Sequence, residues 1–288
     1  MNVTVTGASG YLGASVLRQL VESGHNVVAL ARHKPARLLA PVRWVLGDAR
    51  DMDLLGALEG SDAVVHLIGI IREIPQQGIT FEKMHVGVTE RLLTAMQAAK
   101  VSRLIHMSAL GTRPGAVAQY HRTKWRAEQL IASMSDIAAT ILRPSLIFGG
   151  DPPFFKMLGD LVKLPGVPVP GDGSTLFQPV ARDDIAILIE KLLTDENSAG
   201  VTLEIGGPER FRLTQLMDFM AAKNGRRPPP KIHLPLALVG AVAKLSAVIP
   251  VPVTPDQLAM LTEANVTDDI RWHDWVPHPV PFSSWNLK

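Results

Sequence analysis

The 288-residue chain is long enough to bury about three quarters of its unfolded surface, which predicts one large domain or a domain with a smaller lobe. Its 29 basic and 27 acidic residues give a net charge of +2 with no stripe of Lys and Arg, so nucleic acid is not an expected partner. The lack of cysteine excludes disulfides, thiolate nucleophiles and cysteine zinc sites, and is consistent with a reducing compartment.

Short apolar runs alternate with helix-length segments through the first half of the chain. The runs are NVTVT (2–6), NVVALA (26–31), VRWVLG (42–47), DAVVHLIG (62–69), RLIHMS (103–108) and ATILRP (139–144). Helices are expected over 11–23, ending at Gly24, and over 80–100, where apolar residues recur at helical spacing. This alternation predicts an α/β fold, a Rossmann-type doubly wound parallel sheet with helices on both faces.

The pattern loosens after Pro144, with Gly and Pro dense from 149 to 173, then a helix from about Arg182 and a strand at 201–207. We expect a dinucleotide-binding core over 1–150, to which 176–207 return. A smaller, irregular C-terminal lobe for substrate or partner would comprise 151–175 and 208–288. Such a lobe would close a pocket at the carboxyl edge of the sheet, where α/β sheets bind ligands.

No secretory signal peptide is visible, and the apolar stretch 234–253 is interrupted by Pro235, Lys244 and Pro250. A cytoplasmic location is expected, with peripheral contact to a membrane left open.

The loop TGASGYLG (6–13) follows the first strand and opens the first helix. A tight glycine turn at a helix N-terminus offers unpaired backbone N–H groups and a helix dipole to a pyrophosphate. The alternative is a glycine-rich turn without a ligand. The predicted cofactor contacts in this loop are Gly7, Ser9, Gly10, Tyr11, Leu12 and Gly13.

The second strand ends in ALARH, where many NAD-binding folds place an acid. Arg32, with His33 and Arg37 nearby, would attract a 2′-phosphate, so NADP(H) is preferred and NAD(H) is allowed; a solvated surface arginine is the alternative. Asp48 could accept a hydrogen bond from adenine, and Gly69 would let the backbone approach the cofactor. The predicted contacts after the third and fourth strands are Asp48, Ala49, Leu67 and Gly69.

Tyr120 and Lys124, in YHRTK, are four residues apart and so share one face of a helix. A phenol of pKa about 10 is a poor base at neutral pH, and a nearby cation lowers its pKa. Ser108, at the end of the fifth strand, could hydrogen-bond a substrate oxygen while Tyr120 transfers the proton. The alternative, a Tyr120 that only packs its helix, leaves Lys124 and Ser108 unexplained.

Seven motifs follow one another over about residues 1–207: TGASGYLG, GDARD, VVHLIG, the serine of HMSALG, YHRTK, RPSLIFG and PVARDDIA. Their sequence and order resemble those of the short-chain dehydrogenase/reductase superfamily, in its extended or atypical branch of NAD-dependent epimerase/dehydratase-like proteins. Within that branch, HMSALG, YHRTKWRAEQ and RPSLIFG most resemble bacterial relatives of the NADPH-binding accessory subunit of respiratory complex I.

The resemblance implies hydride transfer between a nicotinamide and a carbon bearing oxygen. Tyr120 would be the acid/base, Lys124 would hold the ribose and Ser108 would polarise the oxygen, with Pro144 and Ser145 beside the nicotinamide. The first hypothesis is therefore an NAD(P)-dependent oxidoreductase, epimerase or dehydratase. The second is a non-catalytic NADPH-binding scaffold or redox sensor that contacts a respiratory complex.

The second lobe suggests an apolar ligand, such as a quinone or a lipid-like carbonyl, because cations that could hold a substrate diphosphate are few. Those cations are Lys156, Lys163, Arg182, Arg210 and Arg212. The apolar residues are Phe154, Phe155, Met157, Leu158, Leu161, Val167, Val169, Leu176 and Phe177, and the alternative is that they form the core of the lobe.

Other polar residues are interpreted as structural. His66 and His106 lie in apolar strands and are expected to be satisfied core histidines. HDWVPH (273–278) predicts no metal site, because prolines flank its histidines. Asp183 and Asp184 are expected to cap the start of a helix.

Overall fold

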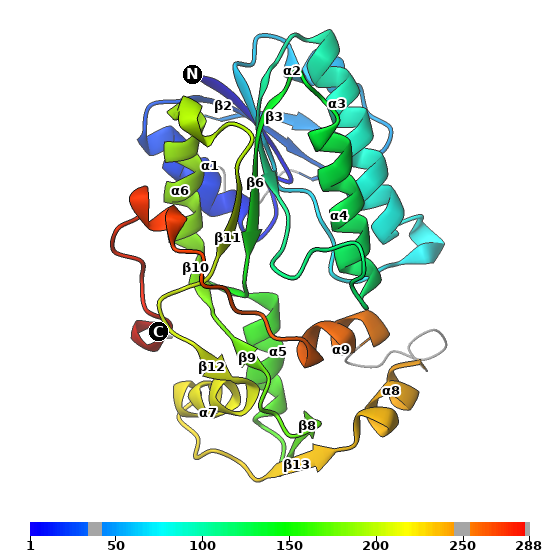
Figure 1. Ribbon diagram of the computed structural model, residues 1–288, viewed down its shortest axis with the longest axis vertical. Coiled ribbons are helices and arrows are strands. Elements are labelled where there is room, and N and C mark those ends of the chain that lie inside the picture. The colour runs from blue at the N-terminus through cyan, green and yellow to red at the C-terminus, as the bar shows by residue number, and fades with distance from the viewer. Residues whose placement is uncertain (34–41, 245–253, 286–288) are drawn as a thin grey trace.

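The computed structural model describes residues 1–33, 42–244 and 254–285. A sheet of seven parallel strands runs through its upper part in the order β11-β6-β5-β4-β1-β2-β3 (Figure 1). The strands are β1 (Asn2–Thr6), β2 (Asn26–Ala31), β3 (Val42–Leu46), β4 (Ala63–His66), β5 (Arg103–Met107), β6 (Ala138–Pro144) and β11 (Thr202–Ile205). The predicted Rossmann-type parallel sheet is confirmed.

Helices cover both faces of the sheet, as a buried parallel sheet requires. On one face lie α1 (Gly13–Glu22) and α6 (Arg182–Thr194), packed on β1 through a cluster that includes Val3, Leu17 and Ile189. On the other face lie α2 (Leu54–Leu58), α3 (Val88–Ala98) and α4 (Gln119–Ala132). The helix expected over 80–100 begins instead with a π-helical turn at Glu82–Gly87, a departure from regular helix that is often found at functional sites.

A second body of structure lies beneath the carboxyl edge of the sheet (Figure 1). It contains α5 (Pro153–Leu161), α7 (Leu213–Lys223), α8 (Leu236–Lys244) and α9 (Pro255–Thr262). Short strand pairs accompany these helices: β8 (Val167–Pro170) with β13 (Lys231–Leu234), and β9 (Leu176–Phe177) with β12 (Phe211–Arg212). A third pair, β7 (Ile147–Phe148) with β10 (Val180–Ala181), lies in two of the segments that connect this body to the sheet.

The apolar residues that suggested an apolar ligand mostly pack against one another. Phe155, Leu158, Val167, Val169 and Phe177 are buried in one cluster between α5, α7 and the short strands. These side chains are therefore core of the second body, and they no longer argue for an apolar pocket.

The last described segment returns to the sheet. Trp272 is fully buried with Val276 in the cluster beneath α1 and α6, and the Trp275 indole donates to Asp195 at 2.8 Å. The domain boundaries proposed from the sequence stay predictions. No helix among the described residues has the length and apolarity to cross a membrane, and part of the 234–253 stretch lies outside those residues.

Candidate functional site

The glycine loop packs tightly between β1 and α1. Gly7 has a φ of +72°, which favours glycine, and its carbonyl accepts a hydrogen bond from the Gly10 amide at 2.9 Å. A Cβ on Gly13 would lie 2.3 Å from the Ala8 oxygen, so only glycine lets α1 begin this close to the loop. The result is a backbone cradle at a helix N-terminus, a shape that suits a pyrophosphate.

The residues predicted to hold adenosine lie at the ends of β2 and β3. Arg32 and His33 are exposed, whereas Arg37 lies outside the described residues. The Asp48 carboxylate accepts from the Arg50 guanidinium at 2.7 and 2.9 Å, and this pairing lowers the pKa of Asp48, with a smaller contribution from Arg32. Adenine would therefore have to share Asp48 with Arg50.

Lys124 is buried at the carboxyl ends of β4 and β5. Its Nζ donates to the Met107 carbonyl at 2.8 Å, and a Cβ on Gly69 would lie 3.0 Å from the same nitrogen. Glycine at 69 therefore leaves room for this ammonium beside the chain. Burial lowers the pKa of Lys124 to about 8, although Glu128 opposes the shift.

Tyr120 lies on the same helix with its ring edge-on to Phe81 and His85, at centroid distances of 5.9 and 5.3 Å. Burial raises the pKa of Tyr120 to about 12, and the Lys124 ammonium does not offset it. The expectation that Lys124 lowers the Tyr120 pKa finds no support in the ligand-free structure and stays a prediction for the cofactor-bound protein. In the ligand-free protein, desolvation of the phenolate is the dominant influence on this pKa.

Ser108 does not face an open site. Its hydroxyl donates to Glu128 Oε1 at 2.5 Å, and only 3% of the residue is exposed. Arg143 holds the same carboxylate through Nε and Nη2, at 3.0 and 2.5 Å. The proton that Ser108 was expected to offer to a substrate oxygen is used inside the protein, so its contacts do not support that role.

The buried histidines differ from one another. His66 is satisfied as expected, by Thr6 at 2.6 Å and Thr89 at 3.3 Å. Both ring nitrogens of His106 are buried without a hydrogen-bond partner among the described residues, so the same expectation is wrong for His106. His85, which the sequence did not single out, accepts from the Ile70 amide at 3.1 Å and so fixes the chain that follows Gly69. Burial lowers the pKa of all three rings.

The segment around Asn265 lies against the end of β6. Ser145 Oγ lies 2.6 Å from Asn265 Oδ1, and the Asn265 amide donates to the Leu110 carbonyl at 3.3 Å. Asn265 is a site residue that sequence reasoning missed, because no spacing connects it with a partner 120 residues earlier. Pro144, the other residue expected beside the nicotinamide, is buried and accepts the Leu110 amide.

Two acidic residues and an arginine mark the start of α6. Asp183 accepts from Ser15 at 2.8 Å and Asp184 from the Val280 amide at 2.8 Å, which supports their structural interpretation. Arg182 lies beside the glycine loop, and its buried Nε has no hydrogen-bond partner among the described residues, only a 3.7 Å ion pair with Asp183. A cation with free hydrogen-bond donors next to a backbone cradle is what a bound dinucleotide diphosphate would complement, so the residues present fit such a cofactor.

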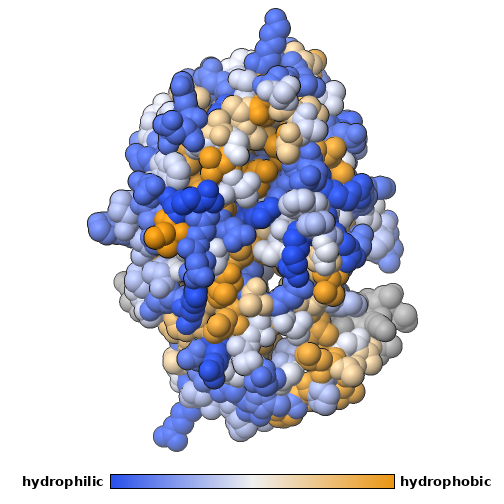
Figure 2. Space-filling view, viewed as in Figure 1, coloured by the Kyte–Doolittle hydropathy of each residue, from blue (hydrophilic) through white to orange (hydrophobic). Residues whose placement is uncertain are grey.

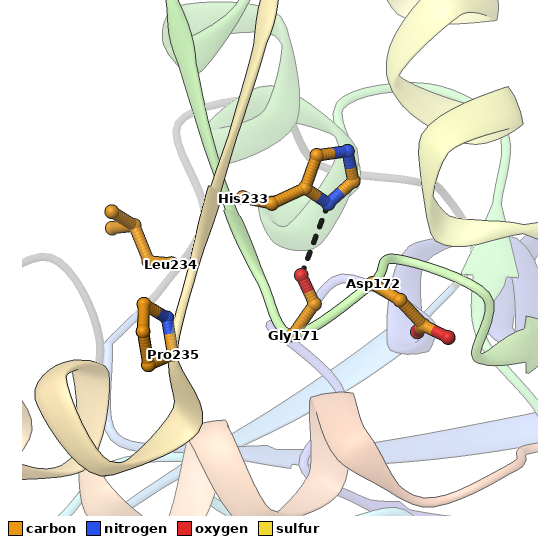
Figure 3. Close-up of a pocket in the computed structure, with 5 residues that line it drawn as sticks. All are labelled: Gly171, Asp172, His233, Leu234 and Pro235. Carbon is orange, nitrogen blue, oxygen red and sulfur yellow. Dashed lines mark hydrogen bonds between the residues drawn. The ribbon is translucent and has the colours of Figure 1, made fainter.

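A separate pocket of about 520 Å³ opens in the second body (Figure 3). It lies at the parallel ends of β8 and β13 and is lined by Gly171, Asp172, His233, Leu234 and Pro235. His233 Nδ1 lies 3.0 Å from the Gly171 oxygen. None of the predicted cofactor or catalytic residues lines it. No group of three or more His, Asp or Glu side chains among the described residues could hold a metal ion.

Comparison with known proteins places these features in a family context. A family model described as NAD(P)H-binding matches residues 7–196. The chain is 31% identical to "NADH dehydrogenase [ubiquinone] 1 alpha subcomplex subunit 9, mitochondrial" of Arabidopsis thaliana, over 96% of this chain and 74% of that protein. It is 28% identical to the 2-alkyl-3-oxoalkanoate reductase of Stenotrophomonas maltophilia, over 78% and 76%. A nucleoside-diphosphate-sugar epimerase from Staphylococcus aureus, 18% identical, shares the fold over 99% of both chains with a TM-score of 0.79.

Proposed function

The chain belongs to the NAD(P)H-binding family of the short-chain dehydrogenase/reductase superfamily, and on that premise we propose that it holds NADP(H) as a structural or sensing component. In this role the cofactor stabilises a binding-competent fold, and Tyr120 and Lys124 hold it without transferring protons. The observation that carries the proposal is the hydrogen bond from Ser108 to Glu128. It removes the donor that carbonyl chemistry at Tyr120 needs.

The electrostatics of Tyr120 support the same conclusion. A general acid/base works best with a pKa close to the working pH. A phenol whose pKa is raised to about 12 stays protonated at neutral pH and is a poor base. Tyr120 can still donate a hydrogen bond from its hydroxyl, which is sufficient to hold a ribose or a carboxamide.

NADP(H) is the preferred form in this proposal. Arg32 and His33 are exposed at the end of β2, where the adenosine ribose would lie, and neither donates a hydrogen bond to a described residue. A guanidinium suits a 2′-phosphate, and no carboxylate follows β2 directly to compete for a 2′-hydroxyl.

The name of the Arabidopsis relative suggests a respiratory complex as partner, and we include this contact in the proposal. Exposed apolar residues are gathered over α8 and α9 on the face shown in Figure 2. Leu236 and Leu238 of α8 are about half exposed, at 47% and 53%. Apolar side chains left in water on one helix are a feature of protein or membrane contacts.

The test measures two things: whether the protein binds NADP(H), and whether the protein catalyses oxidation of NADPH. We expect the purified protein to bind NADPH stoichiometrically and to melt at a higher temperature with it. We also expect no oxidation of NADPH above the protein-free rate when quinones and apolar ketones are added in multiple-turnover reactions. Sustained oxidation that disappears in Tyr120→Phe would refute the non-catalytic role.

The second candidate is an oxidoreductase, which one specific observation favours. Lys124 is buried beside Gly69 with its pKa lowered to about 8, a perturbation of the kind found at catalytic sites. Bound NADPH would supply a hydride to a carbonyl carbon. This reading requires Ser108 to leave Glu128, so a Glu128→Gln variant should change the rate constant of turnover more than it changes NADPH affinity.

A further inference from the structure

Arg182, the first residue of α6, is a partly buried cation whose side chain donates no hydrogen bond to a described residue. Its side chain is 19% exposed, and its buried Nε has only a 3.7 Å ion pair with Asp183. None of its five N–H donors forms a hydrogen bond with a described residue. A guanidinium cannot lose its charge at neutral pH, so this arrangement costs free energy unless a ligand completes it.

Two other partly buried arginines of the described chain donate several hydrogen bonds. Arg143, with 16% of its side chain exposed, donates two hydrogen bonds to Glu128. Arg103 donates to the carbonyls of Ala138 and Leu192 and to a serine hydroxyl. Arg182 has no such partners, so packing alone does not account for its burial.

The surroundings of Arg182 direct it toward the glycine loop. Its guanidinium carbon lies 5.3 Å from the ring centroid of Tyr11, which belongs to the glycine loop. The Tyr11 hydroxyl donates to the Gly149 carbonyl at 2.6 Å and so joins the loop to the turn after β7. Gly150 in that turn has a φ of +61°, and a Cβ there would lie 2.7 Å from Arg182 Nη1. The positive φ favours glycine at this turn, and the absence of a side chain there leaves space that the guanidinium occupies.

We propose that Arg182 is an additional ligand of the cofactor, a cation that pairs with its diphosphate across the glycine loop. This inference rests on the proposed function, since it names a residue of the same cofactor site. The backbone N–H groups at the start of α1 would bind one side of the diphosphate and the guanidinium the other. Tyr11 positions Arg182 by stacking against it.

The nearest carboxylates accept no hydrogen bond from Arg182, although the half-exposed Asp183 forms an ion pair with it. Asp183 Oδ1 is 3.7 Å from Nε, beyond hydrogen-bonding distance, and already accepts from Ser15 and from Arg18 at 2.9 Å. The charge of Asp151 is close enough to raise the pKa of Tyr11, but Asp151 accepts no hydrogen bond from Arg182. An anionic ligand therefore finds an arginine whose donors are free.

The experiment compares two ligands on three proteins. The ligands are NADPH, followed by its fluorescence, and adenosine 2′-monophosphate, which competes for the adenosine site but has no diphosphate. The proteins are wild type, Arg182→Met and the control Lys156→Met, which removes the same charge from an exposed position on α5. Melting temperatures are recorded without ligand.

For Arg182→Met we expect NADPH to bind about tenfold to hundredfold more weakly, the loss typical of a charge-assisted hydrogen bond. Adenosine 2′-monophosphate should bind as to wild type, and Lys156→Met should change neither affinity. The melting temperature of Arg182→Met without ligand should not fall, because the variant loses no hydrogen bond to a described residue and only a long ion pair with the exposed Asp183. A purely structural arginine would instead lower the melting temperature when it is replaced.

Equal NADPH affinities of wild type and Arg182→Met would overturn the inference and leave the proposed function intact. Equal losses for both ligands would overturn it too, because they would mean that Arg182 shapes the whole site. A wild-type protein that binds neither NADPH nor NADH would refute the proposed function, and this inference with it.

Discussion

Lys124→Met should make folding of the ligand-free protein more favourable at neutral pH, because Lys124 is buried as a charge. Its pKa falls from 10.5 in the unfolded chain to about 8 in the folded protein, chiefly by burial. Since each pKa unit corresponds to about 1.36 kcal/mol, the difference lowers the free energy of unfolding by about 3 kcal/mol at pH 7. Loss of the hydrogen bond to Met107 offsets about 1 kcal/mol of the gain in the variant.

The pH dependence of the free energy of unfolding shows whether the buried charge of Lys124 causes the difference in stability. Between pH 8 and 10.5 the unfolded chain still binds the Lys124 proton and the folded protein has released it, so the stability of the wild type rises with pH in this window. The advantage of the variant should therefore shrink by about 2.5 kcal/mol between pH 7 and pH 10.

The assay is urea unfolding of wild type, Lys124→Met and Lys83→Met at both pH values, followed by circular dichroism. Lys83 is exposed and controls for the loss of a lysine side chain. If the wild-type and Lys124→Met stabilities change in parallel from pH 7 to pH 10, the reasoning is refuted.

Three further outcomes are expected. Glu128→Ala should destabilise the protein by about 2 to 3 kcal/mol in urea unfolding, because Arg143 loses both charge-assisted hydrogen bonds and keeps only a 3.7 Å ion pair with Glu204; a loss below about 1 kcal/mol would contradict this. Arg32→Asp should weaken NADPH binding far more than NADH binding in paired titrations, and equal losses would remove the 2′-phosphate assignment. Ultraviolet titration should show little tyrosinate at pH 10, because burial raises the pKa of both Tyr11 and Tyr120; half of one tyrosine ionised there would restore Tyr120 as an acid/base.

The sheet could be predicted because its signals are local. An apolar run such as NVVALA needs only its own residues to indicate a strand, and Gly24, with a φ of +79°, ends α1 where expected. The glycine loop is local for the same reason. Its turn, its helix start and its close approach to Ala8 all lie within eight residues of sequence.

The site could be predicted only as far as each residue acts with its neighbours. Tyr120 and Lys124 lie on one helix as expected, but the Ser108 hydroxyl donates its hydrogen bond to Glu128, twenty residues further along the chain. Asn265 reaches Ser145 from 120 residues away. Such pairings depend on which strands become neighbours, and apolar periodicity does not record the direction in which a polar side chain points.

Lys124 and Arg182 together connect cofactor binding to stability. Both are cations near the carboxyl edge of the sheet; Lys124 is buried, and Arg182 is partly buried with only a 3.7 Å ion pair to Asp183 among the described residues. The buried charge of Lys124 makes the ligand-free protein less stable, and an anionic dinucleotide would relieve that cost and accept the free donors of Arg182. Ligand at one hundred times its Kd stabilises a fold by about 2.7 kcal/mol, which is similar to the cost of Lys124 alone. A protein built in this way would report the presence of its cofactor through its own stability, with no need for turnover.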